Sequence, residues 1–247
     1  MPEVTPSRFM VQAGWNDVPH LDDKTKTEMM GSIEPHLRKA RAEGIPSLGA
    51  GAIYPVDYDE IKVAPFAIPS YWPRGYALDV GWNRTACLWG ARNPDTGVLF
   101  LYSEHYRSHA KPLEHAVAIK ARGDWIKGAI DPAARGRNQK DGTRLKDEYE
   151  GHGLLLSNAV NAVESGIIRV WTELSTQQIR VFTTLTNWKA EFSMYRRDEH
   201  GKIVKKFDHL MDCTRYLVNT WDEIATIHLP QKIGPRGGII ADKRAGY

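Results

Sequence analysis

The sequence predicts an α/β fold with a mixed central sheet flanked by helices. Three apolar runs follow one another between residues 76 and 107, separated by short turns, which is typical of an antiparallel meander. From residue 112 onward, helix-like and strand-like segments alternate, which indicates crossover connections between parallel strands. We therefore expect the fourth strand to lie beside the first.

The meander is recognised by its turns as much as by its strands. Residues 76–82 and 85–92 are short apolar runs, as buried strands require. The turn sequence "NPDTG" follows at 93–97, and residues 98–107 return as a third strand.

The remaining elements follow changes in apolar spacing. Segment 112–123 has helical spacing and ends at a glycine, whereas 125–134 is a buried strand that stops at Asp131-Pro132. Residues 195–206 are expected to form a basic hairpin that turns at "DEHG". Further helices are expected at 144–153, 162–174, 183–195 and 207–221, and further strands at 154–159 and 178–182.

The chain divides into three regions. Residues 1–70 contain one or two short helices within 22–44 and loops rich in glycine and proline, but no long apolar stripe, so we expect an arm or linker there. Residues 71–225 form the main domain, and residues 226–247 are expected to be a flexible basic tail.

The amino-acid composition excludes few functions. The 247 residues, 42% of them hydrophobic, suffice for one substantial core, and a net charge of +3 permits a polyanionic partner without requiring one. Only Cys87 and Cys213 are present, which favours reduced thiols of an intracellular protein over a disulfide framework. No apolar run approaches the roughly 18 residues that a membrane-spanning helix needs.

Acidic residues stand where two strands end. Asp79 interrupts an apolar run, and a charge inside a sheet is costly unless something compensates it. Asp131 closes the fourth strand. If that strand lies beside the first, the two carboxylates converge, and the helix that begins near residue 208 can bring Asp208 or Asp212 to them.

Such a cluster points to divalent cations. Neighbouring carboxylates repel each other, and a hard cation such as Mg²⁺, held by a few carboxylates together with water and phosphate oxygens, removes that penalty. Two ions about 3.5–4 Å apart can activate a water and stabilise the leaving oxygen during phosphodiester hydrolysis.

Each acid also has a purely structural interpretation. The final helix carries one polar stripe, at positions 208, 212, 215 and 219, which taken alone is an ordinary solvent-facing surface. Asp208 suits a helix N-cap and Asp131 suits a turn before proline. Asp79 is the hardest to explain in this way, because strand interiors are depleted in aspartate.

Two other groups of residues are interpreted as structural. The eight tryptophans could stack on nucleic-acid bases, but tryptophans of an α/β domain are usually buried, so they are expected in the core, with Trp82 and Trp89 flanking the first strands. Glu104, His105 and His109 are interpreted as surface residues rather than a zinc site, since no third nitrogen or sulfur ligand is evident.

Three segments taken together resemble the nuclease domain of the viral large terminase subunit of tailed bacteriophages. They are "YALDVGWNRTACLWGA", "AIDPAARGRNQKDG" and "DHLMDCTRYL", in that order. The upstream segments "VQAGWNDVPHL" and "GIPSLGAGAIYPV" resemble the junction between the family's ATPase and nuclease domains. The resemblance extends over about residues 9 to 222.

The resemblance implies a ribonuclease H-like fold and an endonuclease that cuts double-stranded DNA with two Mg²⁺ or Mn²⁺ ions. Asp79 and Asp131 match the first two catalytic acids. The third lies in "DHLMD", where Asp208 and Asp212 both qualify; Asp212 is favoured because it ends a His-x-x-Asp pattern that begins at His209. The family also implies the ATPase domain, the small terminase subunit and the portal protein as partners, in the host cytoplasm.

Basic residues near these segments are candidate DNA contacts, because Lys and Arg neutralise phosphates regardless of base sequence. They are Arg135, Arg137 and Lys140 beyond the second acid, and Arg196, Arg197, Lys205 and Lys206 in the hairpin.

The sequence lacks one feature of a complete terminase. No Gly-x4-Gly-Lys-Ser/Thr motif occurs, so the ATPase is expected on a missing region or on another polypeptide. Two other functions stay open: a non-catalytic DNA-binding and docking module of the packaging motor, or a related nuclease such as a junction resolvase.

Overall fold

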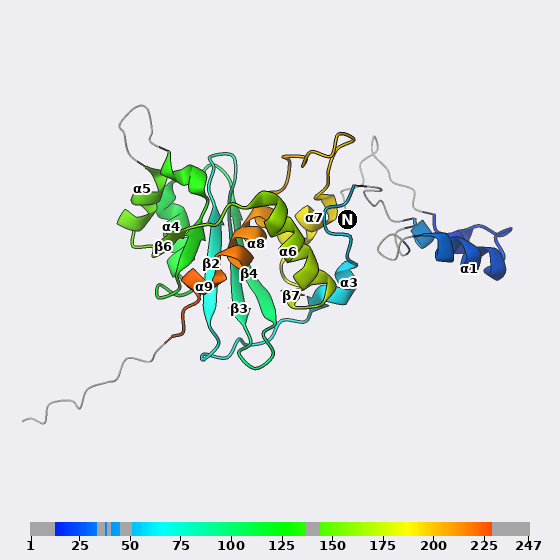
Figure 1. Ribbon diagram of the computed structural model, residues 1–247, viewed down its shortest axis with the longest axis horizontal. Helices are drawn as coiled ribbons and strands as arrows, with labels where there is room; N and C mark the ends of the chain where they lie inside the picture. Colours follow the sequence, from blue (N-terminus) through cyan, green and yellow to red (C-terminus); the bar gives the residue numbers. More distant parts are fainter. Residues whose placement is uncertain (1–12, 34–37, 39–40, 45–50, 137–143, 229–247) are drawn as a thin grey trace, which may run out of the picture.

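The computed structural model describes residues 13–33, 38, 41–44, 51–136 and 144–228 (Figure 1). Within them, one seven-stranded sheet has the order β1-β7-β4-β3-β2-β5-β6. The strands are β1 (Lys62–Val63), β2 (Arg74–Asp79), β3 (Thr85–Arg92), β4 (Leu99–Arg107), β5 (Gly128–Ile130), β6 (Leu156–Asn158) and β7 (Ile179–Phe182).

The pairing confirms the predicted mixed sheet. Strands β2, β3 and β4 form an antiparallel meander. Strand β5 then runs parallel to β2, with Leu78 opposite Ile130, so the fourth expected strand does lie beside the first. Parallel pairs β5–β6, β4–β7 and β1–β7 extend the sheet on both sides.

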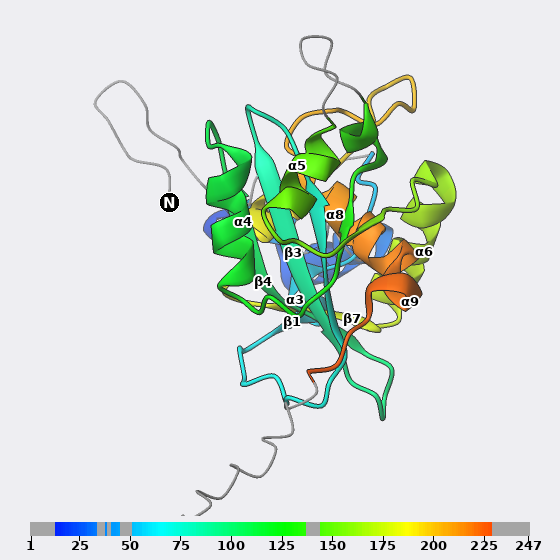
Figure 2. The ribbon, with the colours of Figure 1, turned by 90° about the vertical axis from the view of Figure 1, so that its left-hand side faces the viewer.

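Helices cover both faces of the sheet. Figure 2 shows α4 and α5 on one side, and α6, α8 and α9 on the other. The helices are α1 (Asp23–Ser32), α3 (Tyr58–Ile61), α4 (Pro112–Lys120), α5 (Leu145–Gly151), α6 (Val163–Ser175), α7 (Thr186–Met194), α8 (His209–Asn219) and α9 (Trp221–Ile224). Short 3-10 helices occupy Trp15–Asp17 and Pro132–Arg135.

Strand alternation decides which side chains meet which helices. Tyr76 and Leu78 of β2 point into the core beneath α4 and α5, whereas Ala77 points into the core that contains α8. Because side chains of a strand alternate between faces, Asp79 lies on the same face as Ala77. The sheet therefore presents Asp79 to α8.

The segment expected to be an arm contributes to the core. Ile53, Tyr54 and Ile61 are buried, and β1 continues the sheet beyond β7. Helix α1, in contrast, buries none of its residues and lies apart from the sheet in Figure 1. The expected break near Pro35 lies outside the described residues.

Two further expectations concern the end of the chain and the thiols. Thr226 pairs with Arg74 through both backbone hydrogen bonds, of 2.8 and 2.9 Å, so residue 226, expected in the tail, is joined to β2. The rest of the expected tail, 229–247, lies outside the described residues. Cys87 and Cys213 are buried and form no disulfide. Among the helices described, none is long and apolar enough to cross a membrane.

Candidate active site

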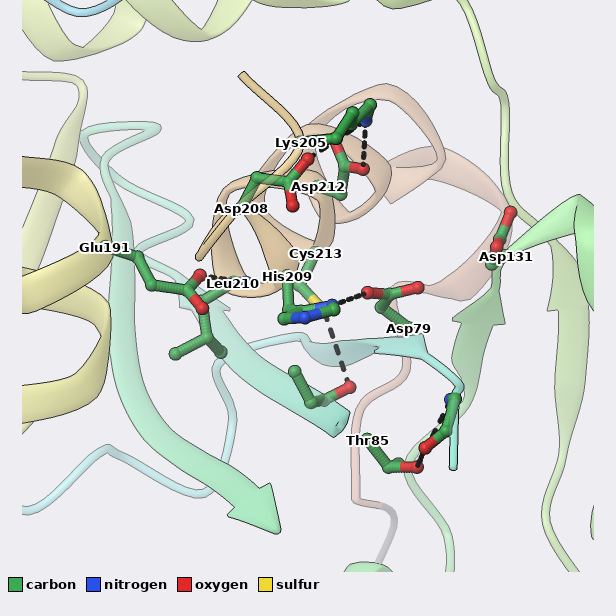
Figure 3. A network of polar contacts seen from close by, with 12 residues as sticks. Asp79, Thr85, Asp131, Glu191, Lys205, Asp208, His209, Leu210, Asp212 and Cys213 are labelled. Atoms are coloured by element: carbon green, nitrogen blue, oxygen red, sulfur yellow. Dashed lines mark hydrogen bonds and ion pairs between the residues drawn. The ribbon is translucent and has the colours of Figure 1, made fainter. Parts of the chain in front are cut away.

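Asp79 and His209 join the end of β2 to the start of α8. Nδ1 of His209 lies 2.8 Å from Oδ2 of Asp79, although the two residues are 130 positions apart (Figure 3). Their side chains are 16% exposed for Asp79 and 35% exposed for His209. The contact that joins this strand-end acid to α8 is therefore made by the histidine, whereas Asp208 and Asp212 were the residues expected to reach it.

Glu191 of α7 holds the first turn of α8 in place. Its Oε2 accepts a 2.5 Å hydrogen bond from the backbone N–H of Leu210, and its Oε1 accepts one of 2.5 Å from the Tyr106 hydroxyl. Asp208 occupies the N-cap position, but its side chain makes no capping bond. Glu191 thus satisfies a free N–H of the helix end in its place.

Asp131 lies next to the end of β2, as expected. Its backbone N–H donates a 3.0 Å hydrogen bond to the carbonyl of Leu78. Its Oδ1 accepts hydrogen bonds from the Ala133 N–H at 3.1 Å and from the Tyr216 hydroxyl at 3.2 Å. The residue therefore both caps the turn after β5 and faces α8.

Asp208 and Asp212 gather around a lysine of the 195–206 segment. Nζ of Lys205 lies 3.0 Å from Oδ2 of Asp208 and 3.2 Å from Oδ2 of Asp212. Arg215 completes the cluster with a 2.8 Å contact to Oδ1 of Asp212. Figure 3 shows Asp79 between His209 and Asp131, with Asp208 and Asp212 grouped at Lys205.

The polar stripe of α8 is not a solvent-facing surface, so that interpretation was wrong. Arg215 is only 1% exposed and Asp208 only 6%. Arg215 also donates a 2.8 Å hydrogen bond to Asn161, which ties α8 to the segment before α6. Amphipathic spacing identifies the polar face correctly, but it does not reveal that other elements cover this face.

The carboxylates are close enough to affect one another. Burial raises the pKa of Asp79; the hydrogen bond from His209 opposes this shift, and the charges of Asp212 and Asp131 add to it. The hydrogen bond to Asp79 raises the pKa of His209. Burial raises the pKa of Tyr216 as well, and Asp131 and Asp212 reinforce the shift. Asp131, just after β5, and Asp212 of α8 thus both act on the pKa of Asp79 at the end of β2 and of Tyr216 on α8.

Known proteins resemble the chain in both sequence and structure. No family model matches it. The large terminase subunits of Enterobacteria phage LP7 and Salmonella phage P22 are each 32% identical over 210 residues, which cover 81% of this chain. The structure of the P22 large terminase nuclease domain has a TM-score of 0.66 and 29% identity, covering 72% of this chain and 96% of that domain.

This chain belongs to the phage large terminase family. The terminase chain spans 44% and 42% of the length of these two relatives, so it corresponds to less than half of each. The large terminase of a thermophilic bacteriophage, at 23% identity and a TM-score of 0.60, shares its fold over 83% of this chain and 54% of that one. The predicted resemblance and the ribonuclease H-like fold are confirmed.

The donor atoms of this candidate site suit a hard divalent cation. All four predicted acids offer carboxylate oxygens, the ligands that Mg²⁺ and Mn²⁺ prefer. Within the described residues, however, no three His, Cys, Asp or Glu side chains are already arranged as metal ligands. Lys205 and Arg215 supply the positive charge next to Asp212 instead.

The candidate DNA-contacting residues differ in whether their side chains are exposed or already paired with acids. Arg196 and Lys206 are exposed. Arg197 is paired with Glu164 through contacts of 2.6 and 3.1 Å, and Lys205 is held by the two acids. Arg137 and Lys140 lie outside the described residues, and only the backbone of Arg135 is described.

The aromatic and histidine interpretations were partly wrong. Trp89 is fully buried, but Trp82 is 65% exposed. His105 is part-buried rather than on the surface, with Nε2 2.9 Å from Nδ1 of His115. Glu104 caps α7 by accepting hydrogen bonds from the backbone N–H groups of Asn187 and Trp188, both at 2.9 Å. A structural role for Glu104 and His105 fits this geometry.

Sequence reasoning missed Glu191, Lys205 as an ion-pair partner of the acids, and the buried state of Arg215. Glu191 had one readable signal: it lies on the same helical face as Trp188 and Phe192, both buried. An acid on an apolar helix face is costly unless it is hydrogen-bonded, and this one is. Lys205 and Arg215 left no such signal, because their partners come from tertiary packing.

Proposed function

We propose that this chain is a metal-dependent endonuclease of a phage DNA-packaging terminase, cleaving double-stranded DNA with little base preference. One observation carries the proposal: Asp79 and Asp131, far apart in the sequence, follow paired residues of the neighbouring strands β2 and β5 and both contact α8, in a fold shared with the P22 nuclease domain. Its proposed partners are the ATPase domain, the small terminase subunit and the portal protein.

The residues that would hold two Mg²⁺ or Mn²⁺ ions are Asp79, Asp131 and Asp212, with Asp208 alongside. Such ions supply an activated water and neutralise charge on the phosphate that is being cleaved. Loss of any one acid is expected to weaken binding of the ions.

Other residues orient these acids. His209 holds the Asp79 carboxylate at 2.8 Å, and the Tyr216 hydroxyl donates to Asp131 at 3.2 Å. Arg215 fixes one oxygen of Asp212. Exposed Arg196 and Lys206 are proposed to hold the DNA backbone, which gives binding without base preference.

One arrangement favours a second function, that of a non-catalytic DNA-binding and docking module. Asp212, the third acid, is engaged by Lys205 and Arg215 rather than directed at the other two acids. If those ion pairs persist in the presence of metal, the site binds DNA without cutting it.

Plasmid cleavage with titrated Mg²⁺ and Mn²⁺ separates these functions. We expect Asp79→Asn and Asp131→Asn to lose at least about a hundredfold in rate, or about 2.7 kcal/mol of transition-state stabilisation, while keeping the wild-type melting temperature. Asp222→Asn, on the exposed side of α9, is the matched control. Wild-type rates in the Asp79 variant contradict the endonuclease, and no cleavage by wild-type protein at any metal concentration favours the docking module. Comparing branched with linear DNA tests for a junction resolvase.

A further inference from the structure

Trp82 stands on the surface beside the proposed active site. It follows Asp79 by three residues, in the loop between β2 and β3, and its 65% exposure is the largest of any tryptophan in the chain. Trp72, Trp89, Trp188 and Trp221 are buried. Since a large apolar ring gains free energy by leaving water, an indole exposed here needs an explanation.

The loop that carries Trp82 is held in place. The Thr85 hydroxyl donates a 3.0 Å hydrogen bond to the carbonyl of Gly81, and the N–H of His109 donates one of 2.9 Å to the carbonyl of Trp82. The His109 ring packs against the indole at 5.6 Å between centroids, and its backbone has a positive φ of 51°. Positive φ is uncommon outside glycine, so the contact is retained against a conformational cost. A fixed indole loses little entropy when it binds a partner.

Cationic residues lie on the segments next to Trp82 in the chain and in the sheet. Arg84 places its guanidinium 4.2 Å from the centre of the Tyr106 ring, and Arg107 pairs with Thr85 across the strands. Lys111 is exposed at the start of α4. Two acids lie close by in the chain or the structure: Glu114, which is paired with Arg107 at 2.8 Å, and Asp79, three residues before Trp82. An exposed aromatic ring with cationic residues on neighbouring segments is typical of surfaces that bind unpaired nucleic-acid bases.

The same loop is connected to the acids. Tyr106, on which Arg84 stacks, donates its hydroxyl proton to Glu191, and Glu191 accepts from the backbone of Leu210 next to His209. His209 in turn holds Asp79. A ligand that rests on Trp82 is therefore supported by the same framework as the proposed catalytic acids.

We propose that Trp82 stacks on an unpaired base next to the phosphate that is cleaved, so that the chain prefers locally opened DNA to intact duplex. The proposal rests on the nuclease function proposed above and adds a substrate preference to it. Bases within a duplex cover one another's faces, so an indole can stack only where a strand is opened or ends.

DNA binding in EDTA tests the proposal without any cleavage. Fluorescence anisotropy compares an intact labelled duplex with the same duplex carrying a few central mismatches. We expect wild-type protein to bind the mismatched DNA more tightly. Trp82→Ala should lose about tenfold in affinity for mismatched DNA and less than about twofold for intact duplex, whereas Trp82→Phe should retain most of the preference. Trp171→Ala, which removes another exposed tryptophan, on α6, should behave as wild type.

Three results would overturn the proposal: equal binding of both DNAs by wild type, an unchanged preference in Trp82→Ala, or no DNA binding at all. An unchanged preference would point to a protein partner at Trp82 instead. Because metal is absent, failure of the hydrolysis proposal does not alter this measurement. Likewise, if the stacking proposal fails, the plasmid cleavage assay still tests the hydrolysis proposal independently.

Discussion

Glu191 is a buried acid, 2% exposed, that binds two neighbours on other elements. Burial raises its pKa, and the hydrogen bonds from Tyr106 and Leu210 oppose the shift. A carboxylate accepts at both oxygens and an amide at only one, so glutamine loses the charge and keeps both partners only if the Tyr106 hydroxyl turns to accept from the amide. The residue is therefore a positioning residue for His209, one step removed from the acids.

The Glu191→Gln variant tests this role. We expect it to lower the free energy of unfolding by about 1–3 kcal/mol, as the loss of a buried charged hydrogen bond does. Cleavage should slow even where the protein is fully folded, because the start of α8 and His209 shift together. Urea denaturation and plasmid cleavage provide the two readouts. The control Glu223→Gln removes an exposed acid of α9 and should change neither; wild-type stability in Glu191→Gln would contradict the role.

The paired histidines predict a sensitivity to acid. Burial lowers the pKa of His105 to about 4, with contributions from His115, Arg122 and Arg107. Burial also lowers the pKa of His115. In the unfolded chain the pKa of histidine is about 6.5. Below that pH the unfolded chain therefore binds protons that the folded chain does not bind until the pH is much lower. The contribution of the neutral histidines to the free energy of unfolding is therefore complete above about pH 6.5 and is lost as the pH falls toward 4.

His105→Gln should flatten the pH dependence of the free energy of unfolding between about pH 6.5 and 4. Urea denaturation at several pH values measures the slope. His20→Gln, at an exposed position, is the matched control and should keep the wild-type slope. A His105→Gln variant with the same slope as wild type would show that the pair does not titrate as described.

Single residues could be predicted from the sequence where their type conflicts with the pattern of the segment around them. Asp79 was found because aspartate is rare inside strands, and the structure places it next to α8. Arg215 and Lys205 escaped because each is ordinary in its own segment and becomes special only through Asp212. Trp82 was assigned to the core because tryptophan is usually buried, yet it is exposed.

Among the elements, α6 and α8 pack closely because of Gly166. An added Cβ there would lie 2.4 Å from Nδ2 of Asn219 and 2.8 Å from Cγ of Arg215. Glycine weakens helices, so Gly166 is unfavourable for the helix that was expected at 162–174. The structure gives its reason: the missing side chain leaves room for the arginine that holds Asp212.

Gly166→Ala should therefore destabilise the protein, although alanine favours helices. We expect a loss of about 1–3 kcal/mol from overpacking, which outweighs a helix-propensity gain of about 1 kcal/mol. Cleavage should also slow, because Arg215 must move. The control Gly151→Ala, in α5, meets nothing within 4 Å and should leave stability equal or slightly higher. A more stable Gly166→Ala variant with full activity would contradict the packing argument.

The periodicity of apolar residues was sufficient to predict the bounds of long helices and strands, but not those of short ones. The meander strands and α8 were predicted close to their observed bounds, because apolar spacing persists over many residues in each. Strand β1 spans only Lys62–Val63 and has no pattern of its own. It exists because β7 offers an unpaired edge, with Lys62 opposite Val181, which is a property of the sheet rather than of the segment.

At the scale of the whole molecule, the pairing of β1 with β7 indicates where the domain begins. We placed its start at residue 71, but Ile53, Tyr54 and Ile61 belong to the same core as α7 and α8. The Arg180 side chain of β7 also donates to the backbone carbonyl of Glu60. We propose that the folding unit begins near residue 51, and that only the preceding residues form an arm.

Two shortened chains test this boundary. A chain of residues 51–228 should unfold at the same urea concentration as the full chain. A chain of residues 71–228 loses three buried apolar side chains, each contributing about 1.5–3 kcal/mol, and leaves β7 as an open edge. We expect it to unfold at markedly lower urea and to aggregate, because an unpaired edge strand recruits other chains. Equal midpoints for the two shortened chains would place the boundary at residue 71 and show that residues 53–63 only rest on a domain that is already complete.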